Sequence, residues 1–183
     1  MRVITGTARG IRLGTVPGND IVRPTPEKIK EAIFSSIQFD IEGRRILDLF
    51  AGCGQLGIEA LSRGAQSAVF VDVSDISLGV VKQNLEATRL GDNASVIRSD
   101  WESFLARCND TFDIAFLDPP YRAGLLENAL SSATKVMSEY GIIICEHPSD
   151  ILLSSSVNGF AVSKEYKYGN IVVTVYRKGG NDE

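Results

Sequence analysis

Three glycines and an acidic residue lie in a short segment that follows an apolar run. Residues 48–57 read Asp-Leu-Phe-Ala-Gly-Cys-Gly-Gln-Leu-Gly, so Gly52, Gly54 and Gly57 satisfy the spacing G-x-G-x-x-G. Glycines at this spacing permit a tight turn from a strand into a helix, and they let a ligand approach the backbone closely. The spacing alone does not distinguish a ligand-binding loop from an ordinary turn.

Aspartates at the ends of consecutive predicted strands indicate which kind of ligand the loop would bind. Asp48 lies beside the loop, where a carboxylate would repel a pyrophosphate and favour a ligand with positive charge. Asp72, 20 residues after Gly52, can accept hydrogen bonds from ribose hydroxyls. Asp100 and Trp101, which we expect to close the third strand, offer an acceptor for an adenine amino group and an aromatic wall. S-adenosylmethionine fits this set, because it carries a ribose, an ammonium and a sulfonium but no phosphate.

A second motif, Asp118-Pro119-Pro120-Tyr121, follows another apolar run. Each proline fixes its own φ and restricts the residue before it, so Asp118 and Pro119 are expected to be extended. The Asp118 carboxylate and the Pro119 carbonyl would then be rigid acceptors for the two N–H groups of a planar exocyclic amine. The amine lone pair would face an electrophilic methyl group, and Tyr121 could stack on the base. The alternative is a proline-rich turn with a buried tyrosine.

Short apolar, β-branched runs predict the strands that position both motifs. They are near-continuous rather than alternating, which is typical of strands covered on both faces. Stretches with helical spacing separate the first five runs, so we expect a parallel sheet with helices on both faces and with both motifs at its carboxyl edge. The runs are 46–50, 68–71, 95–97, 114–117, 142–145 and 171–175.

Helices and a final hairpin complete the predicted sheet domain. One helix carries Leu78, Val81, Leu85 and Thr88 on one face, with Ser74 or Asp75 as its N-cap. Another carries Leu126, Ala129, Leu130, Ala133 and Met137 on one face. Near the end of the chain, residues 158–167 and 170–177 flank the turn signal Tyr168-Gly169-Asn170, so we expect an antiparallel hairpin.

The first part of the chain has a different pattern. Glycines interrupt the strand-like residues 1–16, which predicts a small β-ribbon, and Thr25 can cap a helix whose first residue is Pro26. We therefore expect an extension over residues 1–40 and a sheet domain over residues 41–183. Residues 1–45 hold eight Lys and Arg against five Asp and Glu, although the whole chain carries a net charge of −4.

Composition excludes several other classes of protein. The chain has 183 residues, 44% of them hydrophobic, which is typical of a soluble globular domain. No apolar run approaches the roughly 18 residues of a membrane span, and the first residues lack the apolar core of a signal peptide. Three cysteines without a CxxC pair and one histidine, His147, predict reduced thiols, no metal site and a cytoplasmic protein. We expect Cys53 to be a packed side chain rather than a nucleophile.

The two motifs together resemble the class I S-adenosylmethionine-dependent methyltransferases that modify exocyclic amines. More closely, the chain resembles the RsmD family, bacterial methyltransferases of guanine N2 in 16S ribosomal RNA. The resemblance implies a Rossmann-like α/β fold with a seven-stranded, mostly parallel sheet that ends in an antiparallel hairpin. It is carried by Arg9-Gly10, Arg23-Pro24-Thr25, residues 47–52, 56–65, 112–113 and 117–121, and Lys167-Tyr168-Gly169.

The resemblance also implies roles for individual residues. Asp118, Pro119, Pro120 and Tyr121 would bind and orient the guanine amine. RNA contacts are expected from Arg9, Arg12, Arg23, Thr25 and Arg122. The cofactor would be bound by Asp48, Phe50, Gly52, Cys53, Gly54, Asp72, Val73, Asp100 and Trp101. The chain departs from the family pattern where Cys53 replaces the common serine, Gln55 a small residue, Asp72 a glutamate and Ser35 an asparagine.

The expected partner is 16S ribosomal RNA within the 30S subunit or its precursor, with S-adenosylhomocysteine as the second product and a monomeric enzyme. Two other functions remain open on the sequence. One is an amine methyltransferase of the same motif class that acts on DNA adenine N6 or on protein glutamine. The other is a non-catalytic module that binds an adenosine ligand, which the intact Asp118-Pro119-Pro120-Tyr121 motif disfavours.

Overall fold

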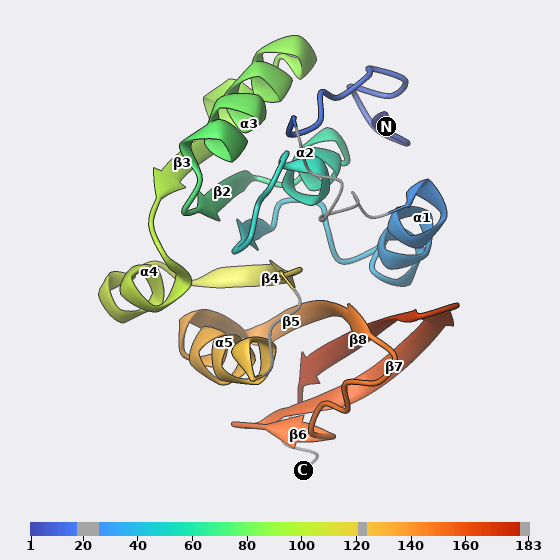
Figure 1. The fold of residues 1–183 in the computed structure, drawn as a ribbon, viewed down its shortest axis with the longest axis vertical. Coiled ribbons are helices and arrows are strands. Elements are labelled where there is room, and N and C mark those ends of the chain that lie inside the picture. Colours follow the sequence, from blue (N-terminus) through green and yellow to red (C-terminus); the bar gives the residue numbers. More distant parts are fainter. Residues whose placement is uncertain (18–25, 121–123, 180–183) are drawn as a thin grey trace.

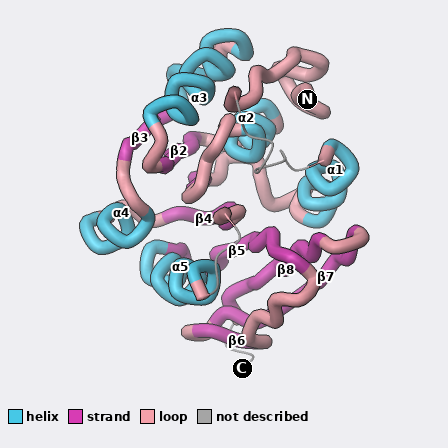
Figure 2. The backbone as a smooth tube through the Cα atoms, in the orientation of Figure 1, coloured by secondary structure: helices cyan, strands magenta, loops and turns pink. Residues whose placement is uncertain are grey.

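A computed structural model describes residues 1–17, 26–120 and 124–179 of the chain. One mixed sheet forms its centre, and helices cover both faces (Figure 1 and Figure 2). Four of the expected site residues, Arg23, Thr25, Tyr121 and Arg122, lie outside the described residues.

The sheet has the strand order β3-β2-β1-β4-β5-β8-β7-β6. Strands β1 to β5 are parallel, and β8, β7 and β6 follow as antiparallel neighbours. The strands are β1 Arg45–Asp48, β2 Ser67–Asp72, β3 Ala94–Arg98, β4 Phe112–Leu117, β5 Met137–Pro148, β6 Ser156–Val157, β7 Phe160–Tyr168 and β8 Ile171–Lys178. All six predicted strands are confirmed, together with the final hairpin.

Alternate residues of the strands face two hydrophobic clusters. In β1, Ile46 belongs to the cluster beneath α1, α2 and α3, whereas Leu47 belongs to the cluster beneath α4 and α5. Figure 1 shows these two groups of helices on opposite faces of the sheet. The helices are α1 Glu27–Ser36, α2 Gln55–Ser62, α3 Asp75–Thr88, α4 Trp101–Arg107 and α5 Leu125–Ala133. No helix in the described part of the chain is long and apolar enough to cross a membrane.

Element boundaries differ from the expectation at three places in the sheet domain. Met137 begins β5 and pairs with Phe112, because α5 ends at Ala133 and a 3-10 turn over Thr134–Val136 leads into the strand. The sheet has eight strands rather than seven, because the two-residue β6 pairs with the start of β7. The third strand ends at Arg98, and Asp100 instead occupies the N-cap of α4.

The extension contains less regular structure than predicted. The expected ribbon is reduced to one antiparallel bridge, between Arg2 and Arg12. Gly6 and Gly10 have φ values of 90° and 85°, so the intervening chain turns tightly instead of extending into a ladder. Helix α1 begins at Glu27, one residue later than expected, with Pro26 at the N-cap position.

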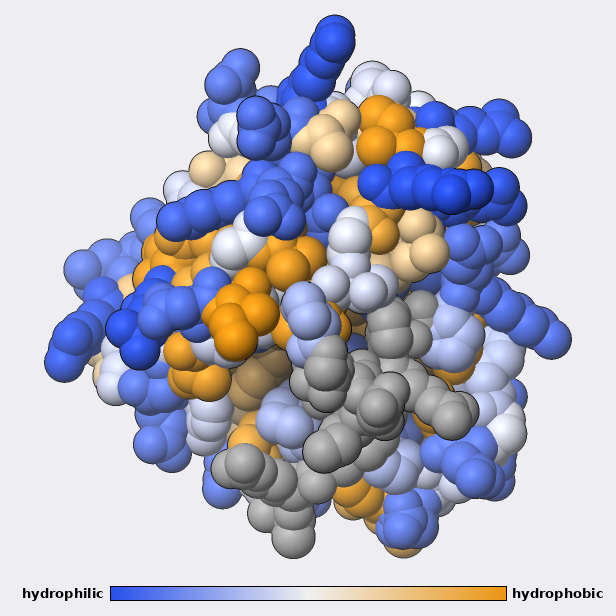
Figure 3. Space-filling view, turned by 45° about the horizontal axis from the view of Figure 1, so that its top comes forward, coloured by the Kyte–Doolittle hydropathy of each residue, from blue (hydrophilic) through white to orange (hydrophobic). Residues whose placement is uncertain are grey.

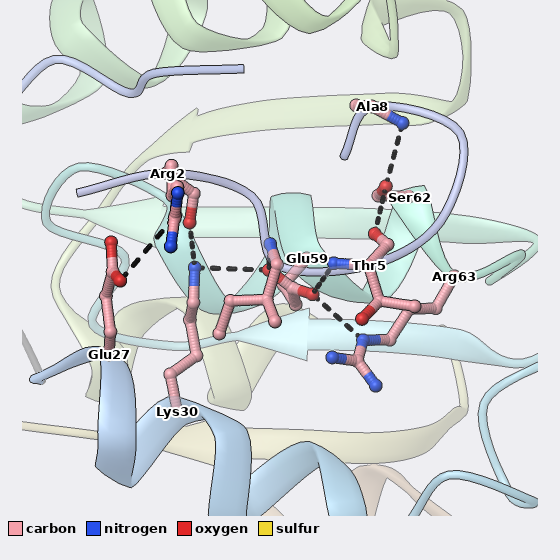
Figure 4. Close-up of polar contacts among 9 residues, drawn as sticks. Arg2, Thr5, Ala8, Glu27, Lys30, Glu59, Ser62 and Arg63 are labelled. Carbon is pink, nitrogen blue, oxygen red and sulfur yellow. Dashed lines mark hydrogen bonds and ion pairs between the residues drawn. The ribbon is translucent and has the colours of Figure 1, made fainter. Parts of the chain in front are cut away.

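A buried carboxylate ties the extension to the sheet domain. Glu59 on α2 is fully buried, and its oxygens accept hydrogen bonds from the backbone N–H groups of Ile4 and Thr5 at 2.8 and 3.0 Å. The same carboxylate pairs with Lys30 of α1 at 3.1 Å and with Arg63 at 2.9 Å. Figure 4 shows Thr5, Lys30 and Arg63 converging on Glu59 from three segments of the chain. The charge of Glu59 is thereby fully compensated within the protein.

We expect the substitution Glu59→Gln to destabilise the protein by about 3–5 kcal/mol, because it leaves the buried Lys30 ammonium without its counter-charge. Urea denaturation measures this change in the free energy of unfolding. The control is Glu86→Gln on the exposed face of α3, for which a change within about 0.5 kcal/mol is expected. Equal stability of the two variants would contradict the assigned role of Glu59.

Candidate active site at the carboxyl edge of the sheet

The structure brings the glycine segment and its aspartates together at the carboxyl ends of neighbouring strands. Asp48 ends β1 and Asp72 ends β2, the strand paired with β1. Asp48 accepts a hydrogen bond from Gly57 N–H at 3.0 Å, and Asp72 accepts one from Gly52 N–H at 2.9 Å. The two carboxylates therefore hold the start and the end of the glycine loop, residues 51–57.

The three glycines serve different steric needs. Gly52 and Gly54 have φ values of 54° and 78°, in the left-handed region that disfavours side chains. Gly57 lies in α2, where an added Cβ would stand 2.3 Å from a ring atom of Phe70. Gly57 thus permits close contact between α2 and β2, while Gly52 and Gly54 form the turn. This division of roles matches that of the dinucleotide-binding fingerprint.

Asp48 has an unusual electrostatic environment. Its side chain is buried, and burial raises the pKa of this carboxyl to about 7, with a further contribution from the nearby charge of Asp72. The hydrogen bond from Gly57 acts in the opposite direction. Among the described residues, no cationic side chain forms an ion pair with either aspartate. A ligand with positive charge would favour the ionised form of Asp48.

The surroundings of the loop also fit an adenosine ligand with an ammonium group. Gln55, at the start of α2, is buried, and its side-chain Oε1 has no hydrogen-bond partner among the described residues. Val73 and Ile76, which follow β2, are 62% and 64% exposed, so apolar surface is available next to Asp72. On the face drawn in Figure 3, a group of hydrophobic side chains reaches the surface among hydrophilic ones. A buried acceptor and open apolar surface suit an ammonium and a planar base, respectively.

Phe50 and Trp101 are half-buried and pack against the cluster beneath α4 and α5. Asp100 caps α4 by accepting a hydrogen bond from Ser103 N–H at 2.8 Å. The bonds from Ser103 lower the pKa of Asp100. A carboxylate offers about four lone-pair positions, so capping does not exhaust its capacity to accept hydrogen bonds.

Cys53 is buried in the loop, and burial raises the pKa of its thiol to about 11. The thiol is therefore neutral near pH 7 and is a poor nucleophile. His147 is also buried: its ring nitrogens lie 2.9 Å from the Pro148 carbonyl and 2.9 Å from the Thr174 hydroxyl. Within the described residues, no group of three or more His, Cys, Asp or Glu side chains is placed to hold a metal ion.

The second motif lies on the strand next to the glycine loop. Asp118, Pro119 and Pro120 directly follow β4, and β4 pairs with β1 so that Phe116 lies opposite Asp48. Asp118 is half-buried, Pro119 is buried and Pro120 is exposed. The change in strand order occurs between β1 and β4, which is where open α/β sheets bind their ligands.

Of the residues expected to contact RNA, Arg9 and Arg12 are described, and both are exposed in the extension. Two buried polar residues that belong to neither motif, Glu59 of α2 and Asn84 of α3, also bind distant segments. Each stands inside an apolar helical pattern, where a buried charge or amide requires a partner. That signal predicts a partner without identifying it, because all of the partners except Arg63 lie 29 to 70 residues away in the sequence.

The fold and the site together define a class of protein. A sheet with the order β3-β2-β1-β4-β5 followed by the antiparallel strands β8, β7 and β6, with a glycine loop after β1, is the Rossmann-like methyltransferase fold. The chain superposes with a TM-score of 0.86 on a solved structure from Escherichia coli described as the methyltransferase yhhF. The two are 31% identical, and 99% of each chain is covered.

Sequence comparison identifies the family within this class. The family described as Conserved hypothetical protein 95 matches residues 1–177, and the chain belongs to it; this is the RsmD family. The chain is 31% identical over 185 residues to Ribosomal RNA small subunit methyltransferase D of Escherichia coli (strain K12), with 100% of this chain and 92% of that protein covered. It is 40% identical over 185 residues to a Bacillus subtilis (strain 168) protein described as an rRNA methyltransferase, YlbH, with 98% and 100% covered.

We expect the ammonium of S-adenosylhomocysteine to lie beside Asp48, so the raised pKa of this carboxyl predicts a pH-dependent affinity for that ligand. A carboxyl that titrates at about 7 is half protonated at that pH, and an ammonium beside it lowers this pKa. Below pH 7, binding therefore releases a proton. The affinity then rises with pH by up to roughly tenfold per unit and levels off above that pKa. Titration calorimetry across this range measures the slope.

Two variants isolate the contribution of Asp48 to this slope. Asp48→Asn is expected to bind more weakly and without the rise below pH 7, whereas Asp92→Asn, at an exposed position after α3, is expected to behave like the wild type. A slope that persists unchanged in Asp48→Asn would show that another group titrates.

Proposed function

We propose that this protein transfers a methyl group from S-adenosylmethionine to the exocyclic N2 of a guanine in 16S ribosomal RNA. The observation that carries the proposal is the position of Asp118-Pro119-Pro120 directly after β4, beside the strand that leads into the glycine loop. Membership of the RsmD family supports the same substrate class.

Residues of the glycine loop and of the adjoining strand ends would hold the cofactor. Asp72 would accept hydrogen bonds from the ribose, and Asp48 would face the positive end of the ligand. Val73, Phe50 and Trp101 would line the space for the adenine. When bound, the cofactor supplies an electrophilic methyl group on a sulfonium.

Asp118 and Pro119 would hold the acceptor amine. Their carboxylate and carbonyl oxygens accept the two amine N–H groups, so the nitrogen lone pair is directed out of the base plane toward the site of methylation. The negative charge of Asp118 also stabilises the positive charge that develops on the nitrogen during transfer. The proton released afterwards passes to water or to Asp118.

The basic extension would contact the RNA. Arg9 and Arg12 are exposed there, and residues 1–40 would form the RNA-facing part, whereas residues 41–183 would form the catalytic domain. The overall negative charge implies a small basic footprint, so we propose that the substrate is an assembled or assembling 30S particle rather than naked RNA. The protein would act as a cytoplasmic monomer.

The direct test is transfer of a tritiated methyl group to 30S particles that lack the modification. We expect label on guanine N2, and a loss of roughly 100-fold or more in rate for Asp118→Ala, because the amine loses both its orientation and its counter-charge. Asp92→Ala provides a control at an exposed aspartate away from the motif. Nucleoside mass spectrometry of the RNA identifies the labelled base.

Other outcomes of this experiment have distinct meanings. Label on adenine or cytosine would contradict guanine N2 as the acceptor. Label on DNA or protein but not on the particle would favour the second class of amine methyltransferase. Binding of S-adenosylhomocysteine without turnover on any acceptor would indicate a non-catalytic module.

A further inference from the structure

The side-chain amide of Asn84 connects the extension to the glycine loop. Asn84 lies on α3 and is only 3% exposed. Its Nδ2 donates to the Cys53 carbonyl of the loop at 2.9 Å and to the Gly14 carbonyl of the extension at 3.1 Å. Its Oδ1 accepts from Gly14 N–H at 2.7 Å. The oxygen and nitrogen of one buried amide thus form hydrogen bonds with two segments that are far apart in the sequence.

The extension has a second anchor on the helix that follows the loop. Helix α2, which begins directly after Gly54, carries Glu59, and Glu59 binds the backbone of Ile4 and Thr5. One turn further on, Ser62 Oγ accepts from Ala8 N–H at 3.0 Å and donates to the Thr5 carbonyl at 2.6 Å. Residues 1–14 are therefore attached to the helix that leaves the loop and, through Asn84, to the loop itself.

We propose that Asn84 is a positioning residue that couples the conformation of the extension to cofactor binding in the glycine loop. The proposal rests on the proposed function, because it takes the loop to be the cofactor site. Asn84 itself acts through the Cys53 carbonyl and is not assigned a contact with the ligand.

The backbone of the loop explains why such a contact has an effect. Cys53 lies between Gly52 and Gly54, both of which have positive φ, and glycines restrict backbone rotation less than other residues do. The hydrogen bond from Asn84 fixes the direction of the peptide group between Cys53 and Gly54. A ligand that orders this loop strengthens the hydrogen bond from Asn84 Nδ2 to the Cys53 carbonyl. The Asn84 side chain is then less mobile, so its hydrogen bonds restrict the backbone of Gly14 more strongly.

The coupling acts in both directions, because linked equilibria are reciprocal. If cofactor binding orders residues 1–14, then a partner that orders these residues raises the affinity for the cofactor by the same factor. Arg9 and Arg12 are exposed on this segment. RNA bound there would therefore favour the cofactor-bound state of the loop, so that substrate and cofactor bind cooperatively.

Hydrogen exchange with S-adenosylhomocysteine as the probe tests the coupling without any RNA. In the wild type, saturating ligand is expected to slow exchange in the peptide that spans residues 3–14 by roughly five-fold or more. In Asn84→Ala, at a ligand concentration raised until the loop is again saturated, residues 3–14 are expected to show no such slowing. A peptide within β8 serves as the internal reference.

Two further variants separate positioning from general destabilisation. Gln83→Ala changes the exposed neighbour on the same helix and is expected to match the wild type. Asn84→Leu fills a similar volume without a donor, an acceptor or a buried charge, so it removes the bonds to Cys53 and Gly14 without leaving a cavity. It is therefore expected to lose the slowing even if Asn84→Ala does not fold.

The outcomes distinguish this inference from the proposed function. Equal slowing in the wild type and in a folded Asn84 variant would overturn the coupling while leaving the cofactor site in place. Ligand binding without any slowing of hydrogen exchange in residues 3–14 of the wild type would also overturn the coupling. Failure of the wild type to bind S-adenosylhomocysteine at all would overturn the proposed function itself, and the coupling with it.

Discussion

Glu59 carries a full charge in the interior of the protein, and the arrangement of the extension depends on how that charge is compensated. Lys30 is equally buried, so burying either charge without the other would cost free energy of folding. Hydrogen bonds from the backbone of Ile4 and Thr5 satisfy the remaining acceptor positions of the carboxylate. The extension cannot leave α2 without exposing or orphaning these charges. Charge compensation therefore attaches the backbone of Ile4 and Thr5 to α2, which hydrophobic contacts alone would specify less strictly.

Carboxylates have two roles at the carboxyl edge of the sheet. Asp48 and Asp72 each accept a hydrogen bond from the backbone of the glycine loop, so they fix its two ends before any ligand arrives. The same two groups place negative charge in a partly desolvated position, which raises the pKa of Asp48. A site built in this way is selective for a cationic ligand over a phosphate. Fixing the ends in advance also lowers the cost of ordering the rest of the loop on binding.

The sequence predicted the sheet and the position of both motifs because these depend on local signals. Near-continuous runs such as Ile142–Cys145 identify buried strands, and glycines identify the turn after β1. Boundaries were less predictable: Met137 fits the apolar spacing of α5, yet it pairs with β4. The extension was predicted as a ribbon, but its geometry depends on contacts with Glu59 and Asn84 that are distant in the sequence. Local patterns show that such residues need partners, and only the fold shows which partners they have.

The most direct test of the site is a crystal structure of the protein with S-adenosylhomocysteine bound. We expect the ribose hydroxyls to contact Asp72, the amino acid end to lie beside the glycine loop, and the sulfur to face Asp118. A hollow at the opposite edge of the sheet, lined by Asp40, Arg44 and Tyr140 among others, offers an alternative location. A ligand bound there, or a ligand at the carboxyl edge without contact to Asp72 and the glycine loop, would contradict the proposed cofactor site.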